Sequence, residues 1–294
     1  MRALARRYGW PLAGLIVLLS TFWVVVQVLL PQLLMLDFSL RPNLLPAERG
    51  GAQDVYTLAN YATLWRNPVH FGIFVKTLLA SAAVTLTTFV VCYPVAFHVA
   101  RLARAGRARR LLLLLVVPFW INEILRTFAW FILLSWSGPL NALLLALGLV
   151  DAPVRFLDGN AGVMLGMVYA YLLFMVFPLY HAIESLDPHQ VEAARDLGAS
   201  WWRIHWRIVL PHAKPGIATG CIMVFMLAAG SYAVPALLGS PKSRWFTEII
   251  YNWFFEGGDW HQGAAYAFIL LLLCVGFIVL MLRLFRVRLG ELAR

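Results

Sequence analysis

The sequence predicts an all-α integral membrane protein with six transmembrane helices. Of its 294 residues, 62% are hydrophobic and only 13% are charged, which is a poor composition for a water-exposed surface. Six apolar runs are long enough for a helix of about 20 residues to cross a bilayer. The first run is longer than a signal-peptide core and lacks a cleavage pattern, so we expect it to be retained. The six runs cover residues 10–36, 71–100, 111–136, 161–180, 215–239 and 263–282.

Basic residues predict the orientation of these helices. The formal net charge is +10, which in a soluble protein would raise nucleic acid as a partner. Most of the arginines, however, lie in alternate connections, where membrane topology places them. We therefore expect no nucleic-acid partner, contact with membrane lipid, and both termini in the cytoplasm. The basic segments are 1–9, 101–110, 182–214 and 283–294.

The expected order along the chain follows from the runs and their connections. A cytoplasmic tail (1–9) precedes the first transmembrane helix (10–36) and an outer segment (37–70). A core at 71–283 holds the other five helices and a cytoplasmic loop at 182–214, and a second tail covers 284–294. Short helices at 55–65 and 140–150 are too short to cross, so we place them at the outer membrane surface. Prolines interrupt several spans, and either ordinary kinks or bends around a passage would explain them.

The cytoplasmic loop has an unusual helical pattern. Asp187 and Pro188 suit the cap and first position of a helix, and Gly198 suits its end because glycine accepts a positive backbone angle. Ala193 and Ala194 would give that helix a small-residue side. A second amphipathic stretch starts near Trp201, and we expect Pro211 to stop it. The result is a helix–turn–helix elbow, which either connects two spans or receives another protein.

The spacing within this loop resembles the EAA motif of bacterial ABC-importer permease subunits. The matching run is Glu192-Ala193-Ala194, three residues, Gly198, nine residues, Ile208, one residue and Leu210-Pro211. The resemblance implies a type I importer permease, with a five-helix core plus one N-terminal helix, in the bacterial inner membrane. It also implies that the loop is a coupling helix docked on a separate ATP-hydrolysing subunit. The implied docking residues are Glu192, Ala193, Ala194, Asp196 and Gly198, while Ile208, Leu210 and Pro211 set the angle of re-entry into the membrane.

Further strings are similar to the first permease subunit of spermidine/putrescine importers. They are Pro118-Phe119-Trp120-Ile121-Asn122, the segments 148–153 and 178–180, and the loop segment 192–200. This similarity implies transport of polyamines, and relatives that carry other organic solutes or iron look alike. The implied partners are a second permease subunit, a dimer of ATP-binding subunits and a periplasmic substrate-binding protein.

Motifs for enzymatic chemistry are missing from the sequence. It contains no G-x-x-x-x-G-K-[ST] loop and no arrangement typical of a nucleophilic enzyme. We therefore expect no catalytic residue and no cofactor on this chain, with ATP and magnesium bound by the partner ATPase. Five histidines near the cytoplasmic side lack ligand-like spacing, and the cysteines all fall in apolar runs, so we expect neither a metal site nor a disulfide framework.

Polar and aromatic side chains near the spans are candidates for the substrate passage. Glu123 and Arg126 are three residues apart within the third run, so they either pair with each other or Glu123 faces the passage with Trp120 and Asn122. A carboxylate beside an aromatic ring would attract a cation.

Two further groups complete the candidates, and each also has an ordinary explanation. Ser231 and Tyr232 interrupt the fifth run, either for helix packing or as part of a gate. Trp253 and Glu256 belong to an outer segment that is either an aromatic belt or the mouth of the passage. A stand-alone secondary transporter or channel, and a membrane scaffold without transport, remain the rival functions.

Overall fold

The structure is a computed structural model that describes residues 9–287, apart from 46, 49, 103–104 and 242. Within those described ranges every regular element is a helix. Five helices there are long and apolar enough to cross a membrane, and a sixth span results if the bent pair Trp201–His212 and Lys214–Gly230 counts as one. The prediction of an all-α membrane protein with six spans is thus confirmed. The tails predicted at 1–9 and 284–294 lie largely outside the described residues.

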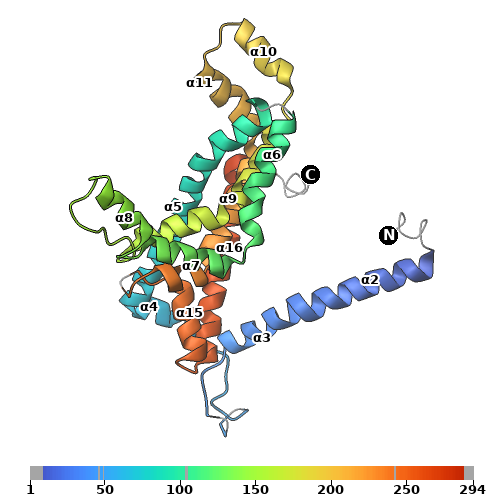
Figure 1. Ribbon diagram of the computed structural model, residues 1–294. Helices are drawn as coiled ribbons and strands as arrows, with labels where there is room; N and C mark the ends of the chain where they lie inside the picture. Colours follow the sequence, from blue (N-terminus) through green and yellow to red (C-terminus); the bar gives the residue numbers. More distant parts are fainter. Residues whose placement is uncertain (1–8, 46, 49, 103–104, 242, 288–294) are drawn as a thin grey trace. The chain divides into compact units, whose positions relative to one another are not determined.

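Contacts divide the chain into two units. The first comprises Met1–Pro68 and Ile250–Ile269, and the second comprises Val69–Ile249 and Leu270–Arg294. The N-terminal part of the first unit is drawn in blue in Figure 1, and its first run forms one helical stretch, Trp10–Ser39. The helix predicted at 55–65 begins later, at Ala59. The elements of this part are α2 (Trp10–Val24), the π-helical turn η1 (Val25–Leu29), α3 (Leu30–Ser39) and α4 (Ala59–Arg66).

Arg41 holds the irregular segment between α3 and α4 together. Its guanidinium pairs with Asp37 at 3.0 Å and with Asp54 at 2.9 Å, and it lies 4.8 Å from the centre of the Tyr56 ring. The Gly50 N–H and the Arg41 side chain donate to Asp54 and lower the pKa of its carboxyl below the ordinary value. The ion pairs of one guanidinium with two carboxylates therefore stabilise this stretch, in which the described residues form no helix.

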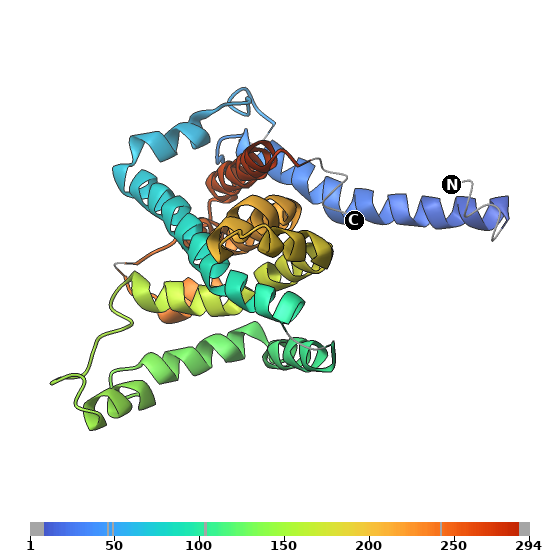
Figure 2. The ribbon, with the colours of Figure 1, turned by 90° about the horizontal axis from the view of Figure 1, so that it is seen from above.

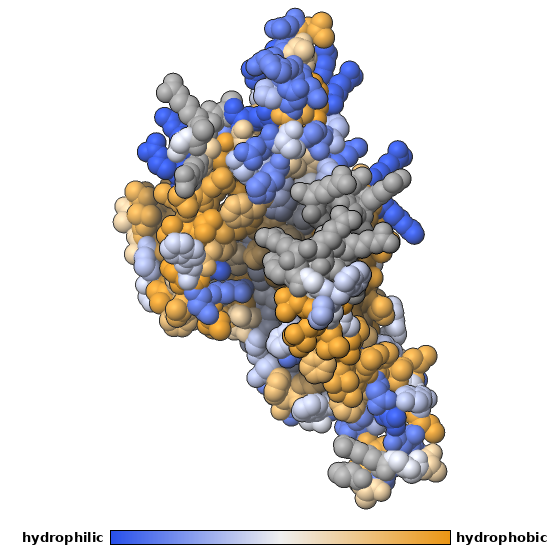
Figure 3. All heavy atoms as spheres, turned by 90° about the vertical axis from the view of Figure 1, so that its right-hand side faces the viewer, coloured by the Kyte–Doolittle hydropathy of each residue, from blue (hydrophilic) through white to orange (hydrophobic). Residues whose placement is uncertain are grey.

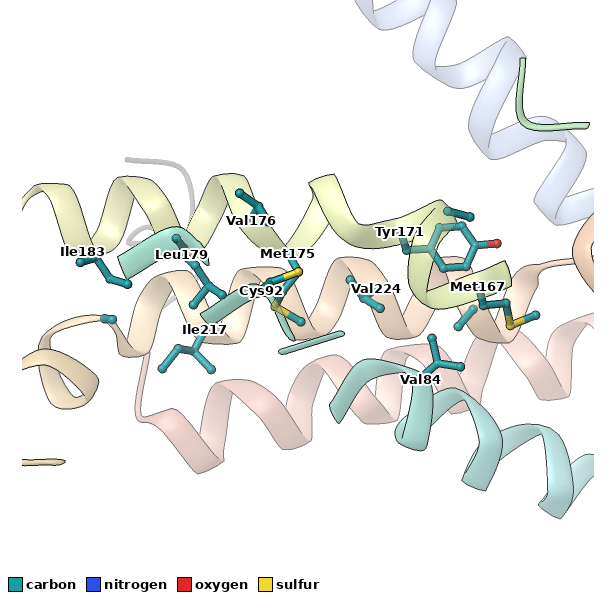
Figure 4. Close-up of a cluster of buried hydrophobic side chains, with 14 of the residues drawn as sticks. Val84, Cys92, Met167, Tyr171, Met175, Val176, Leu179, Ile183, Ile217 and Val224 are labelled. Carbon is teal, nitrogen blue, oxygen red and sulfur yellow. The ribbon is translucent and has the colours of Figure 1, made fainter. Parts of the chain in front are cut away.

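The core of the second unit lies between α5 (Pro68–Phe97), α9 (Asn160–Glu184) and α13 (Lys214–Gly230). Figure 4 shows Cys92, Met175 and Val224 from these three helices pointing toward one another, and all are buried. Helices α9 and α13 approach closely because α13 has a glycine at the crossing: a Cβ at Gly216 would lie 2.4 Å from the carbonyl oxygen of Pro178. Small residues at such crossings are how membrane helices gain packing contacts.

The third apolar run, 111–136, is not one continuous helix, and it breaks at Pro118, one of the prolines expected to interrupt a span. Helix α6 (Ala105–Val116) passes into the 3-10 turn η3 (Val117–Trp120), and α7 (Glu123–Leu134) starts after an extended residue, Ile121. In Figure 2, α6 is seen end-on while α7 lies across the view. Two residues explain the break. Pro118 lacks a backbone donor, and Asn122 caps α7 by accepting the Ile124 N–H at 2.8 Å.

The turn after α7 ends in α8 (Pro139–Ala146), which corresponds to the short helix expected at 140–150. Gly138 is required there, because a Cβ would lie 2.4 Å from the carbonyl oxygen of Ile132. The amide of Asn141 is buried and bonds to both the N–H and the carbonyl of Val154, at 2.9 and 3.0 Å. This side chain holds the connection between α8 and α9.

The loop at 182–214 folds into the predicted elbow, drawn in yellow and brown in Figure 1. Its second arm does not stop at Pro211, as expected, but continues to His212. A π-helical turn precedes Pro211, and such a turn tolerates the missing N–H of a proline inside a helix. The fifth run breaks at Ser231 and Tyr232, as predicted. The remaining elements are η2 (His98–Leu102), α10 (Pro188–Asp196), α11 (Trp201–Ile204), η4 (His205–Val209), α12 (Leu210–His212), α14 (Ala233–Leu238), α15 (Phe246–Phe255) and α16 (Trp260–Phe285).

Candidate functional site

Local hydrogen bonds define the first arm of the elbow, helix α10. The Asp187 carboxylate accepts the His189 N–H at 3.0 Å, and Pro188 occupies the first turn, where a proline loses no hydrogen bond. His189 and Glu192 lie one turn apart, with Nδ1 and Oε2 separated by 3.2 Å. The start of this helix is therefore specified by its own sequence, as predicted.

Gly198 ends α10 through a Schellman motif. The Ala199 N–H donates to the Ala194 carbonyl at 2.9 Å and the Gly198 N–H donates to the Arg195 carbonyl at 2.8 Å. The φ angle of Gly198 is 75°, and no atom lies within 4 Å of a Cβ built there. Ser200 then caps the second arm by accepting the Arg203 N–H at 3.4 Å. Glycine is thus needed for the backbone angle and not for space.

The solvent-exposed face of α10 is not, as the sequence predicted, the side formed by Ala193 and Ala194 together. Glu192, Ala193 and Asp196 are exposed, whereas Ala194 is half-buried and packs against the hydrophobic core. Leu197, at the tip, is 87% exposed; its apolar side chain beside the glycine turn was a signal that sequence reasoning overlooked. Figure 3 shows mostly hydrophilic side chains over this elbow. The free face therefore combines two carboxylates, one alanine and one exposed leucine.

The base of the elbow is tied to the core helices. An Arg101 Nη2–H of η2 donates to the carbonyl of Leu186, just before α10. On the second arm, buried His205 bonds through Nδ1 to the Tyr93 hydroxyl at 2.6 Å.

The re-entry residues lie where that second arm meets the core. Ile208 and Leu210 are half-buried against it, while Pro211 is exposed. The helical pair Trp201–His212 and Lys214–Gly230 bends by 71°. A force applied to α10 would thus reach α5, α9 and α13 through fixed contacts.

Three helices meet at the candidate passage in the second unit. The Tyr171 hydroxyl of α9 donates to Glu123 Oε1 of α7 at 3.5 Å, and the Ser231 side chain lies near the same hydroxyl. The Ser231 carbonyl in turn accepts the Thr247 hydroxyl at 2.6 Å. The structure therefore brings Glu123 and Ser231 together through Tyr171, which sequence reasoning missed. A tyrosine hydroxyl inside an apolar run was the available signal, because such a group needs a partner when buried.

Glu123 and Arg126 do not form the alternative ion pair, since no nitrogen–oxygen distance of 4.0 Å or less joins them among the described residues. Arg126 instead lies over the ring of Phe119, with 4.3 Å between the guanidinium carbon and the ring centre. Trp120 is 82% exposed, and Tyr232 is exposed at the start of α14. The carboxylate of Glu123 is therefore not neutralised by its neighbour on α7.

Two other candidates, Trp253 and Glu256, belong to the first unit, on and just after α15. Trp253 is half-buried and Glu256 is exposed. Over the described part of the chain, no group of three or more histidine, cysteine or carboxylate side chains is arranged to hold a metal ion.

Comparisons with known proteins agree with this architecture. The family model of the binding-protein-dependent transport system inner membrane component matches residues 69–287. The spermidine/putrescine transport system permease protein PotB of Salmonella typhimurium is 40% identical over 243 residues, 83% of each chain. PotB of Escherichia coli is 39% identical over 83% of this chain and 86% of its own. A crystal structure of a bacterial ABC transporter that imports alginate has the same fold, with a TM-score of 0.76, 18% identity and 97% of both chains covered.

The family model spans the second apolar run, the elbow and the last span, which is most of the chain. The elbow and the helices around Glu123 both lie within this match. The chain therefore belongs to the family of binding-protein-dependent transport system inner membrane components and is a multi-pass permease subunit of an ABC importer.

Proposed function

We propose that this permease subunit forms part of the passage for polyamines such as spermidine and putrescine. The observation that carries the proposal is the 39–40% identity to permeases of that name over 83% of the chain. The chemistry near α7 supports it, because a carboxylate that has no ion-pair partner among the described residues, and that lies near aromatic rings, attracts ammonium groups. Within the passage we assign contacts with substrate to Trp120, Asn122, Glu123, Ser231 and Tyr232, and we place Trp253 and Glu256 at its outer mouth.

The energy for transport comes from a separate ATPase that docks on the elbow. We assign the contact to the exposed residues Glu192, Ala193, Asp196 and Gly198. Ala194 supports α10 from behind. Ile208, Leu210 and Pro211 set the angle between elbow and membrane. ATP and magnesium are bound by that ATPase dimer, and this chain holds no cofactor. A second permease subunit completes the passage, and a periplasmic binding protein delivers the substrate.

The elbow converts ATPase closure into helix movement. Because Arg101 and His205 tie the elbow to the core helices, displacement of α10 moves the inner ends of α5, α9 and α13. The passage then opens to the outside, and hydrolysis resets it. This orientation places the elbow and both termini in the cytoplasm, as the basic segments favour.

Uptake competition tests the substrate. The importer assembled with its partners is supplied with labelled spermidine, and unlabelled amines, amino acids, ferric iron or molybdate are added in excess. Di- and polyamines should block uptake, while the other solutes should not. Blocking by iron or molybdate, with no effect of amines, would instead support the alternative of an importer for another solute.

Cross-linking tests the docking face. Ala193→Cys places a thiol on the exposed side of α10, and Leu149→Cys places an exposed thiol at the end of α8 as a control. The three native cysteines are buried or half-buried, so background reaction should be low. A cross-link to the ATPase from position 193 alone is expected. No cross-link from 193, or one of equal yield from 149, would remove the docking assignment.

A further inference from the structure

One arginine in the second unit has an environment that the proposed function does not explain. Arg126 lies on α7, one turn after Glu123, within a stretch that is apolar enough to cross the membrane. Its guanidinium carbon is 4.3 Å from the centre of the Phe119 ring and 5.9 Å from that of Tyr169. A cation in an apolar span is costly, so its partners indicate what the position is for.

The hydrogen bonds of Arg126 are incomplete. Its Nε and Nη1 atoms are buried and have no acceptor within the described part of the structure. A structural arginine in such a place normally has its N–H groups satisfied, since each buried donor without an acceptor is destabilising. The Glu123 carboxylate is on the same helix but accepts from Tyr171 instead. The contacts that the described residues show for this guanidinium are therefore the rings of Phe119 and Tyr169, and none of the ion pairs among those residues includes it.

The aromatic rings continue beyond Arg126 along α9 and α7. Tyr169 stacks on Phe119 with 6.1 Å between ring centres and meets Trp130 edge-on at 5.4 Å. Tyr169 and Trp130 also line a groove of about 450 Å³, whose other walls are Thr87, Met164, Leu165, Val168 and Leu172. An apolar groove that starts at an aromatic cation site suits a chain of methylene groups with an ammonium at its end.

We propose that the rings of Phe119 and Tyr169 form a subsite for one ammonium group of the transported amine, and that Arg126 fills this subsite while the amine is absent. The inference rests on the proposed function and adds the residues that hold the cation. The guanidinium is an internal competitor. An arriving ammonium displaces it from the rings, and Arg126 moves toward Glu123.

This competition has a consequence for specificity. When a substrate with one positive charge binds the aromatic subsite, Arg126 loses its contacts with the rings. The net gain in binding free energy is therefore small. A polyamine brings a second ammonium, which remains available for an acceptor other than Glu123. Arg126 therefore lowers affinity for all amines and discriminates most strongly against monoamines. Weak binding in the passage also favours release.

The test measures uptake by the complete importer with Arg126→Met, and with Arg126→Lys as the conservative variant. For Arg126→Met, the KM for spermidine should fall roughly threefold to thirtyfold, as expected for one cation–π contact. The maximal rate should also fall, and butylamine should become an effective inhibitor. Arg126→Lys, which keeps a displaceable cation, should resemble the wild type. All rates are normalised to assembled importer.

A second variant tests whether the Phe119 ring binds the substrate or only packs against Arg126. In the Arg126→Met background, Phe119→Leu removes the ring from the substrate alone, so the KM for spermidine should rise. An unchanged KM and unchanged butylamine inhibition in Arg126→Met, or an unchanged KM when Phe119→Leu is added to Arg126→Met, would overturn the inference. Wild-type importer that takes up no amine would instead refute the proposed function itself.

Discussion

Replacing Gly198 with valine should uncouple ATP hydrolysis from uptake. The φ angle of Gly198 is 75°, and a Cβ there would meet no atom within 4 Å. The whole effect therefore comes from the backbone, where the left-handed conformation costs an L-residue about 1–2 kcal/mol and more for a β-branched side chain. A cost of that size changes the population of the native turn by a factor of about 5–30. The angle between α10 and α11 would lose its definition while the core keeps its packing.

The chain offers a matched control for this strain. Gly148 ends α8 with the same pair of hydrogen bonds, from Leu149 to Leu144 and from Gly148 to Leu145, and has a φ of 64° with equally open space. In proteoliposomes, the ratio of substrate moved to ATP hydrolysed should fall several-fold for Gly198→Val and stay unchanged for Gly148→Val. Gly198→Asn should retain much of the ratio, because asparagine tolerates this conformation. Equal ratios in all four proteins would refute the reasoning.

Three other predictions concern packing and electrostatics. Gly216→Ala should lower the stability of the detergent-solubilised chain by about 1–3 kcal/mol through overpacking, whereas Gly276→Ala, with no atom near its Cβ, should not; equal thermal unfolding would contradict the close crossing of α9 and α13. Asn141→Leu should expose residues 147–159 to protease, because it removes the two hydrogen bonds to the N–H and carbonyl of Val154, each worth about 0.5–1.5 kcal/mol; unchanged cleavage would argue against this role of Asn141. Since folding lowers the pKa of Asp54, its stabilisation exists above the ordinary carboxyl pKa and disappears as pH falls through the lowered one. Segment 41–56 should therefore resist protease at neutral pH but not in strong acid, and Asp54→Asn should be sensitive at both; resistance of this variant at neutral pH would exclude the role of the carboxylate.

Local signals in the sequence were enough to predict most of the elements. The caps at Asp187 and Gly198 act within one helical turn, so they could be read without the rest of the fold. The break at Ser231 was predicted for the same reason. Pro118 marked the third run as bent or broken, but the start of the new helix was missed, because the cap at Asn122 marks a new helix only when the preceding residue is known to be extended.

Contacts between distant segments were beyond the reach of sequence reasoning. The pairing of Glu123 with Tyr171 joins two helices 48 positions apart, and nothing in either segment indicates the other. Periodicity also could not tell which alanine of the elbow faces solvent. Leu186 and Ile204, at the base of the elbow, are buried in the hydrophobic core. Their burial sets the rotation of α10 about its own axis, so that Ala194 packs against the same core. The sequence also left open whether Arg126 pairs with Glu123, because it could not show that Phe119, on the other side of the helix break, offers a competing contact.

ATP-dependent accumulation of spermidine tests the account most directly. The complete importer is reconstituted in vesicles with ATP and magnesium on the side of the elbow and the binding protein on the other side. Labelled spermidine should accumulate against its gradient only when both are present, and dissipating the ion gradients should not prevent it. Accumulation that persists without ATP and follows an ion gradient would contradict the account and identify a secondary transporter.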